Sequence, residues 1–148
     1  MNSDALQPIP YLFFDGKCSE AFDFYADLFG GKIVSKMTYG DLPADMHGDM
    51  PIPDEAMGFV VNERLELADG LMLYGGDTRP GWAHAPMAGV MLALNFPTVE
   101  QAQNVFDKLA DGGHISMPFA PAFWAEKFGM VTDKYGIEWC VNGNLGQS

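Results

Sequence analysis

The sequence predicts an α+β fold built from two copies of one βαβββ unit. Each half places a β-rich apolar run before an amphipathic helical stretch that ends at a pair of glycines, and the apolar positions of the two stretches repeat at a fixed interval. A chain of 148 residues with 48% apolar residues has the size and material for one core. We therefore expect a single domain over residues 1–148, with modules at about 8–76 and 89–142 joined by a connector at 77–88.

The first module begins with a strand at residues 9–14, which Asp15-Gly16 ends. Ser19 and Glu20 mark the start of the helix that follows, and Gly30-Gly31 ends it because glycine adopts left-handed conformations without steric cost. A second strand is expected at residues 32–39. The apolar stripe of the helix consists of Ala21, Phe22, Tyr25, Leu28 and Phe29.

Residues 40–55 are rich in Pro, Asp and Gly and predict a long loop that is functional or mobile. Two further strands are expected at residues 57–67 and 71–74, and the sequence Ala68-Asp69-Gly70 between them favours a hairpin turn.

The second module repeats this order. A strand is expected at residues 90–96, and Thr98 with Gln101 forms the capping-box pattern that starts a helix. Gly112-Gly113 ends the helix, whose apolar stripe consists of Ala102, Val105, Phe106 and Leu109. Further strands are expected at residues 114–119, 127–132 and 137–141, the last two joined by a turn at 133–136.

The two helical stretches align without a gap. Their apolar positions 21 and 102, 25 and 106, and 28 and 109 are each 81 residues apart, and after the glycine pairs Ile33 matches Ile115 at 82. Gly70 and Gly136 precede the last strand of each half. The shared order of elements indicates an internal duplication.

Charge and composition exclude several classes of function. A net charge of −12 argues against nucleic acid as a partner, and no apolar run is long enough for a membrane span. The N-terminal residues lack the basic and apolar regions of a signal peptide. Cys18 and Cys140 are far apart and outside any CxxC spacing, so we expect a cytoplasmic protein without disulfides.

Two stretches carry a family resemblance. Residues 10–16 read PYLFFDG, and residues 123–139 read FWAEKFGMVTDKYGIEW. Both resemble the PhnB-like branch of the vicinal oxygen chelate superfamily, which includes glyoxalases, bleomycin-resistance proteins and dioxygenases. The likeness covers nearly the whole chain apart from the loop at 40–55 and the connector.

The resemblance implies paired βαβββ modules, each curling its mixed sheet into half of a cupped site, and usually a homodimer. Superfamily members include metal-dependent lyases, isomerases, ring-cleaving dioxygenases, fosfomycin-resistance transferases and metal-free drug-binding proteins. Fold alone therefore does not choose a reaction.

Superfamily enzymes hold a divalent metal through His and Glu or Gln on the first and last strand of each module. Within one residue, the resemblance places these four positions at Pro10, Tyr74, Met91 and Cys140. Proline and methionine offer no hard donor and tyrosine is a rare ligand, so we expect no metal and no other cofactor.

The remaining metal-binding residue types fall in loops. We expect His47, His84 and His114 to be solvent-facing or structural. The acidic stretch around Asp45 and Asp49, with Asp41, Asp54 and Glu55 nearby, lacks the alternation of a calcium loop and predicts a solvated loop.

Neither methyl transfer nor covalent catalysis has a motif here. No glycine-rich turn opens either helix, as a nucleotide-like cofactor requires. No serine, histidine and carboxylate set can be brought together, and Cys140 has no neighbour that lowers its pKa. The catalytic residues, if any exist, are unknown at this stage.

A metal-free cup is expected to be lined by inward-facing strand residues, with Trp124 the strongest candidate. The first hypothesis is a module that binds a small, partly apolar molecule without metal. The second is a divalent-metal-dependent lyase or dioxygenase that uses unusual donors such as Tyr74 and Cys140, and the third is a scaffold without a ligand. The expected pocket residues are Tyr11, Phe13, Asn62, Tyr74, Asn95, Trp124, Trp139 and Cys140.

Overall fold

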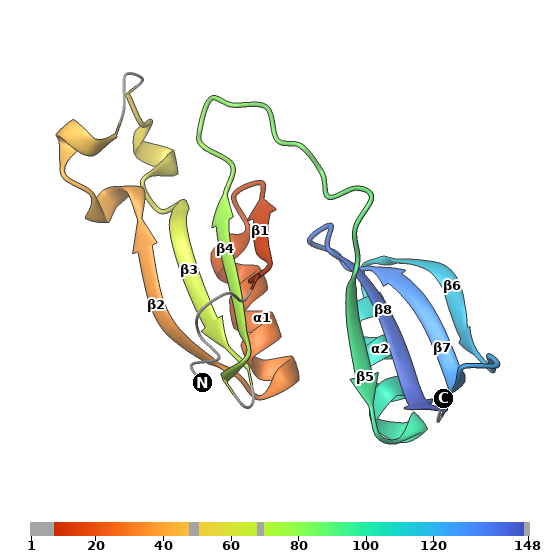
Figure 1. The fold of residues 1–148 in the computed structure, drawn as a ribbon. Helices are drawn as coiled ribbons and strands as arrows, with labels where there is room; N and C mark the ends of the chain where they lie inside the picture. Colours follow the sequence, from red (N-terminus) through yellow and green to blue (C-terminus); the bar gives the residue numbers. More distant parts are fainter. Residues whose placement is uncertain (1–7, 48–50, 68–69, 147–148) are drawn as a thin grey trace. The chain divides into compact units, whose positions relative to one another are not determined.

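In the computed structural model, which describes residues 8–47, 51–67 and 70–146, the chain divides into two units between Ala85 and Pro86 (Figure 1). Each unit contains one helix and four strands in the order strand, helix, strand, strand, strand. The predicted α+β class and the predicted pair of βαβββ modules are therefore confirmed. That the two modules form a single domain over residues 1–148 stays a prediction.

The elements of the first unit are β1 (Tyr11–Phe14), α1 (Cys18–Phe29), β2 (Lys32–Thr38), β3 (Val60–Glu66) and β4 (Met72–Asp77). Those of the second are β5 (Leu92–Phe96), α2 (Val99–Ala110), β6 (His114–Ala120), β7 (Ala125–Thr132) and β8 (Glu138–Leu145).

Both sheets have the same mixed topology. The strand orders are β1-β4-β3-β2 and β5-β8-β7-β6, and the first strand of each unit pairs in parallel with the last. Tyr11 lies opposite Tyr74 in the first sheet, and Ala93 lies opposite Cys140 in the second. The two registers correspond residue by residue, which supports the predicted duplication.

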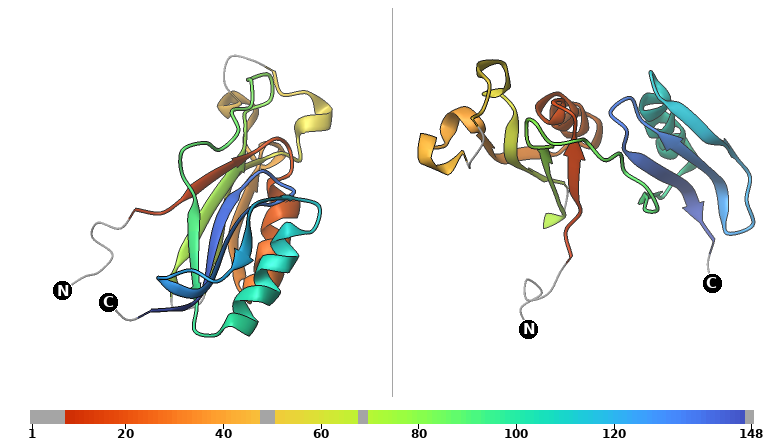
Figure 2. Two further views of the ribbon diagram at one scale, coloured as in Figure 1. Left: turned by 90° about the vertical axis from the view of Figure 1, so that its right-hand side faces the viewer. Right: turned by 90° about the horizontal axis from the view of Figure 1, so that it is seen from above.

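One face of each sheet is covered by the helix of the same unit (Figure 2). A Cβ added to Gly75 of β4 would lie 2.6 Å from the ring of Phe22 on α1. In the second unit, a Cβ on Gly143 of β8 would lie 3.0 Å from the Cβ of Ala102 on α2. Glycine in the last strand therefore lets each helix approach its sheet closely. We call the uncovered face of each sheet its open face.

The two helices begin in different ways. The predicted Thr98 cap of α2 is confirmed, because the Gln101 amide donates to the Thr98 hydroxyl at 3.2 Å. The start of α1 is not capped locally by Ser19. Instead, Asp77 at the end of β4 accepts from the Cys18 amide at 2.9 Å and from the Val60 amide at 2.8 Å. A carboxylate 59 residues away thus satisfies a free amide at the helix start.

Several strand ends differ from the sequence prediction. β4 continues beyond residue 74 to Asp77, and β8 continues beyond residue 141 to Leu145, because each pairs along its length with a neighbouring strand. β7 begins at residue 125 rather than 127. β3 starts only at Val60, since the 3-10 helix at residues 54–56 is followed by a turn in which the Phe59 amide donates to the Ala56 carbonyl at 3.0 Å.

The segment predicted as a long loop contains three 3-10 helices, η1 (Tyr39–Asp41), η2 (Ala44–Met46) and η3 (Asp54–Ala56). A small buried cluster of Tyr39, Ile52 and Ala56 joins η1 and η3, whereas η2 has no buried residue. The predicted turn at residues 68–70 falls partly outside the described residues, although the antiparallel pairing of β3 with β4 that it would connect is present.

Within the described ranges, no helix has both the length and the apolar character needed to cross a membrane.

The close approach at Gly75 predicts a stability cost for any side chain there. Gly75→Ala places a methyl group against the Phe22 ring, which is fully buried and packs edge-on against Phe14 at 5.9 Å, so the ring cannot move aside. We expect a loss of about 2 kcal/mol in the free energy of unfolding, measured by urea denaturation. Gly58→Ala, where a Cβ would meet no atom within 4 Å, is the control and should change stability by less than about 0.5 kcal/mol. Equal effects of the two substitutions would contradict this packing.

Candidate functional site

Four of the predicted pocket residues gather on the open face of the first unit. Tyr11 stacks on Phe13, with ring centroids 5.0 Å apart, and meets Tyr74 edge-on at 6.3 Å. The Tyr11 hydroxyl donates to the Val61 carbonyl at 3.0 Å and accepts from the Asn62 side-chain amide at 3.2 Å. Tyr11 and Phe13 are 40% and 54% exposed, so this face presents aromatic rings to solvent.

A polar network occupies the open face of the second unit. The Trp124 indole donates to the Asn142 side-chain oxygen at 3.1 Å, and the Asn142 amide donates to the Asn95 oxygen at 3.0 Å. Asn142 is buried between two more exposed partners. It was not predicted from the sequence, because the last strand was expected to end at residue 141, whereas β8 continues to Leu145 and includes it. The network holds the Trp124 ring in one orientation.

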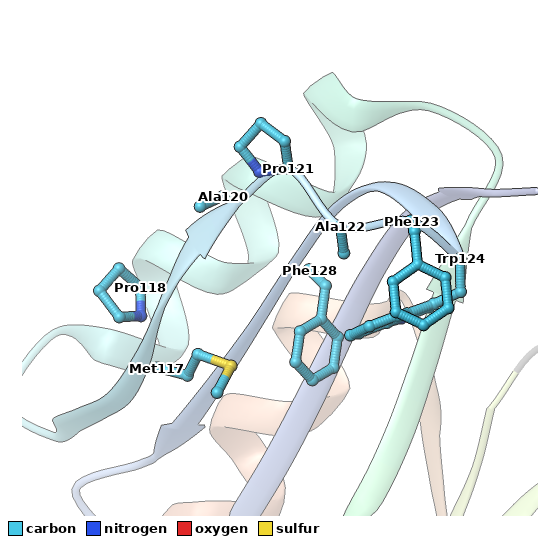
Figure 3. A pocket seen from close by; sticks show the side chains of 8 residues that line it. All are labelled: Met117, Pro118, Ala120, Pro121, Ala122, Phe123, Trp124 and Phe128. Atoms are coloured by element: carbon cyan, nitrogen blue, oxygen red, sulfur yellow. The ribbon is translucent and has the colours of Figure 1, made fainter.

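A hollow of about 480 Å³ lies beside this network in the second unit (Figure 3). Trp124 forms part of its wall and meets the Phe128 ring edge-on at 5.0 Å. Phe123, which precedes Trp124 and also lines the hollow, is 96% exposed. All eight lining residues are apolar: Met117, Pro118, Ala120, Pro121, Ala122, Phe123, Trp124 and Phe128.

The other two predicted pocket residues lie apart from this hollow. Trp139 is 1% exposed and donates through its indole to Asp133 at 2.9 Å, so it belongs to the core rather than to the open face where we expected it. The cause is strand alternation, because Gly143 shares its side of β8 and faces α2. Cys140 lies on the opposite side of β8, and burial raises the pKa of its thiol.

The strand register places the candidate metal positions. Two of the four expected positions are shifted: Pro10 and Met91 lie just before β1 and β5, and on the open faces the residues opposite Tyr74 and Cys140 are Tyr11 and Ala93, the latter two residues beyond Met91. Two phenols, a methyl group and a thiol of raised pKa do not make the donor set of a divalent metal site. Across the described part of the chain, no group of three or more His, Cys, Asp or Glu side chains is placed to hold a metal ion.

The histidines of the loops make local contacts. His47 places Nε2 at 2.9 Å from the Tyr39 carbonyl, and His84 places Nδ1 at 2.7 Å from the Thr78 hydroxyl. His114 is exposed at the start of β6. In the acidic loop, hydrogen bonds from Thr38 lower the pKa of Asp41. Asp49, the end of the acidic stretch considered above, lies outside the described residues.

A buried acidic cluster under α1 was missed by the sequence analysis. Glu63 of β3 is fully buried, and the Cys18 thiol lies 3.7 Å from its Oε1, while its Oε2 has no hydrogen-bond partner. Burial raises the pKa of Glu63 to about 7, against the lowering effect of Lys36, with Asp23 and Asp77 adding to the rise. The alternation that buries Leu65 on the same strand was the available signal.

Burial and the neighbouring carboxylates also raise the pKa of the Cys18 thiol, and burial raises the pKa of Asp77. Both thiols of the chain are therefore held in the protonated form, which is a poor nucleophile. The arrangement is suited to packing and hydrogen bonding rather than to covalent chemistry.

Comparison with known proteins agrees with this fold. Residues 9–141 match the model of the Glyoxalase/Bleomycin resistance protein/Dioxygenase superfamily. Protein YjdN of Escherichia coli (strain K12) is 34% identical over 140 residues, covering 90% of this chain and 92% of YjdN.

Two solved structures are also similar. Protein PA1353 from Pseudomonas aeruginosa is 34% identical with a TM-score of 0.79, covering 93% of this chain and 97% of PA1353. The PhnB protein from Bacillus cereus is 28% identical with a TM-score of 0.75, covering 93% of this chain and 98% of that protein.

The buried carboxyl group predicts a pH dependence of stability. Because the pKa of Glu63 in the folded protein, about 7, lies above its ordinary value of 4.5, the folded state binds more protons between these values. The stability contributed by Glu63 is therefore fully present below about pH 4.5 and is lost as the pH rises to about 7. Glu63→Gln should remove this loss and be more stable than the parent at pH 8, by at most about 3 kcal/mol, with little difference at pH 4.5.

Urea denaturation from pH 4.5 to pH 8 measures this effect. Glu66→Gln changes a less buried carboxylate of the same strand and is the matched control. If Glu63→Gln shows the same pH profile as the parent protein, Glu63 does not titrate in this range.

The amide network predicts a specific spectroscopic change. Asn142→Ala removes the partner of both Trp124 and Asn95, and we expect a loss of about 1 kcal/mol together with a shift of the Trp124 indole resonance in the ¹H–¹⁵N spectrum. Asn104→Ala removes an amide from an exposed position of α2 and should leave that resonance in place. An unshifted Trp124 signal in Asn142→Ala would show that the network does not hold the ring.

Proposed function

The chain belongs to the glyoxalase/bleomycin resistance protein/dioxygenase superfamily, and we propose that it binds a small, partly apolar molecule without a divalent metal. The observation that carries the proposal is the apolar hollow of the second unit, with Trp124 in its wall. Concave apolar surfaces with a few oriented polar groups are typical of small-molecule sites.

In this proposal, Trp124 is the ring on which a ligand stacks. An indole ring offers a large apolar surface, and stacking of an aromatic ligand on it adds to the gain from burial alone. Asn142 already orients the ring at 3.1 Å, so little side-chain freedom is lost when a ligand binds. The amide of Asn95 at the end of the network adds a polar group nearby.

The donor chemistry argues for binding over metal-assisted catalysis. A divalent ion that polarises a substrate needs three or more nitrogen, oxygen or thiolate ligands around an open position. The open-face positions Tyr11, Tyr74, Ala93 and Cys140 do not provide such a set. We therefore favour sequestration or sensing of a ligand over the lyase and dioxygenase activities known in the superfamily.

We expect the protein to act as a homodimer in the cytoplasm.

Titration with 1-naphthol, a neutral and partly apolar probe, tests the proposed function. We expect it to shift the Trp124 indole resonance, and Trp124→Ala should weaken binding at least about 10-fold, or about 1.4 kcal/mol, because the stacking surface is lost. Val90→Ala removes a side chain of the same unit that is 54% exposed and lies outside the hollow, and it should leave the affinity unchanged.

Thermal melts with zinc, manganese or nickel complete the test, since a bound metal raises the melting temperature by mass action. We expect no shift. A rise in melting temperature that a chelator reverses would overturn the metal-free proposal in favour of a metal-dependent lyase or dioxygenase, and absence of any 1-naphthol effect at Trp124 would overturn the binding site.

A further inference from the structure

A second hollow, of about 320 Å³, lies within the first unit. Phe13 of β1 and Tyr39 of η1 line it together with Asp77, Thr78 and Arg79, which follow one another at the end of β4. Unlike the hollow of the second unit, its lining includes a permanent positive charge. This charge belongs to one of only eight Lys and Arg residues in a chain of net charge −12.

Arg79 is held in place by neutral partners. Its guanidinium group lies over the Tyr39 ring, 5.9 Å from the centroid, and donates a hydrogen bond to the His47 carbonyl. Tyr39 is buried, so it offers a rigid surface beneath the cation. Among the residues that the structure describes, Arg79 forms no ion pair with a carboxylate. The guanidinium group carries five N–H donors, and this arrangement leaves most of them for a further acceptor.

Asp77, the only carboxylate among the lining residues, already accepts two hydrogen bonds from backbone amides. Asp77 is 4% exposed, and its two oxygens accept from the backbone amides of Cys18 and Val60. It therefore secures the start of α1 and the end of β3 rather than neutralising Arg79. A guanidinium group in a hollow with apolar walls and no ionic partner favours an oxyanion, which it can bind through two parallel hydrogen bonds.

Two exposed aromatic side chains, Phe13 and Trp82, also line this hollow. Trp82 is 64% exposed, and Phe13 is 54% exposed although Tyr11 stacks on its ring at 5.0 Å, so both rings have surface available to a planar group. The Thr78 hydroxyl, 2.7 Å from Nδ1 of His84, adds a hydrogen-bonding group beside Arg79. A cation, a hydroxyl and two exposed rings together suit a ligand that is anionic at one end and aromatic at the other.

We propose that this hollow binds a small aromatic oxyanion, whose carboxylate or phosphate group pairs with Arg79 while its ring packs against Phe13 and Trp82. This inference goes beyond the proposed function, because it assigns a second hollow, whose lining shares only Phe13 with the predicted pocket residues. Carboxylate and phosphate share the planar or near-planar pair of oxygens that a guanidinium group recognises, so both belong to the proposed class.

Three probes of similar size test the proposal: benzoate, phenyl phosphate and neutral benzamide. Binding is followed through the Trp82 indole resonance in the ¹H–¹⁵N spectrum of the full chain. At least one of the two anions should shift this signal and bind about 10-fold or more tightly than benzamide, and the preferred anion identifies a carboxylate or a phosphate ligand. Affinity for that anion should fall as sodium chloride is raised.

Two substitutions of Arg79 and one control locate the interaction. Arg79→Gln should reduce the affinity for the preferred anion about 10-fold, to that of benzamide, and Arg79→Lys should keep part of it because the charge is retained without the fork of donors. Arg64→Gln is the matched control, since Arg64 also lies over a tyrosine ring, at 4.9 Å from Tyr74, but outside this hollow. It should bind the anion as the parent does.

Any one of three results would overturn the inference. The first is that benzamide binds as tightly as both anions, and the second is that Arg79→Gln and Arg79→Lys both bind the anion as the parent does. The third is the absence of any shift at Trp82 with all three probes. None of these results depends on the 1-naphthol titration at Trp124, so failure of the inference and failure of the proposed function remain distinguishable.

Discussion

The parallel pairing of the first and last strands of each unit is the constraint on which the rest of the structure depends. β1 pairs with β4 and β5 pairs with β8, and the helix that follows the first strand covers one face of the resulting sheet. That face must pack closely against the helix, which explains glycine at positions 75 and 143. The opposite face has no helix packed on it in the same unit, and there the chain places the aromatic side chains Tyr11, Phe13 and Trp124 at 40–54% exposure.

The first backbone amides of a helix need hydrogen-bond acceptors, and the two units supply them in different ways. In the second unit, Thr98 caps α2 from the adjacent residue, and Gly143 lies under the helix. In the first unit, Asp77 reaches the start of α1 from the end of β4 and brings a carboxylate into the interior near Glu63 and Cys18. Because the oxygens of Asp77 accept from the Cys18 and Val60 amides, Asp77 does not pair with Arg79, two residues further along the chain. A structural difference between the duplicated modules thereby produces a difference in their surface chemistry.

The open faces therefore offer different chemistry. The first presents aromatic rings, one of which, Phe13, also lines the hollow that contains Arg79, and the second presents Trp124 oriented by an amide network beside an apolar hollow. Both thiols have raised pKa values, and the positions where the superfamily resemblance implies metal donors carry groups unsuited to that task. Stacking, burial and hydrogen bonding are the interactions that these surfaces supply, which is why binding is the function they support best.

The sequence by itself determined the elements whose causes are local. Apolar periodicity predicted both helices, the glycine pairs predicted their ends, and Thr98 with Gln101 predicted one start. The repeated order of these signals predicted the duplication and the sheet class. Tertiary structure alone decided that Trp139 is core while Trp124 is exposed, that Asn142 joins the site, and that Asp77 caps α1. The physical reason is that local periodicity records neighbours along the chain, whereas these roles depend on strand register, and a shift of one residue moves a side chain to the other face of its sheet.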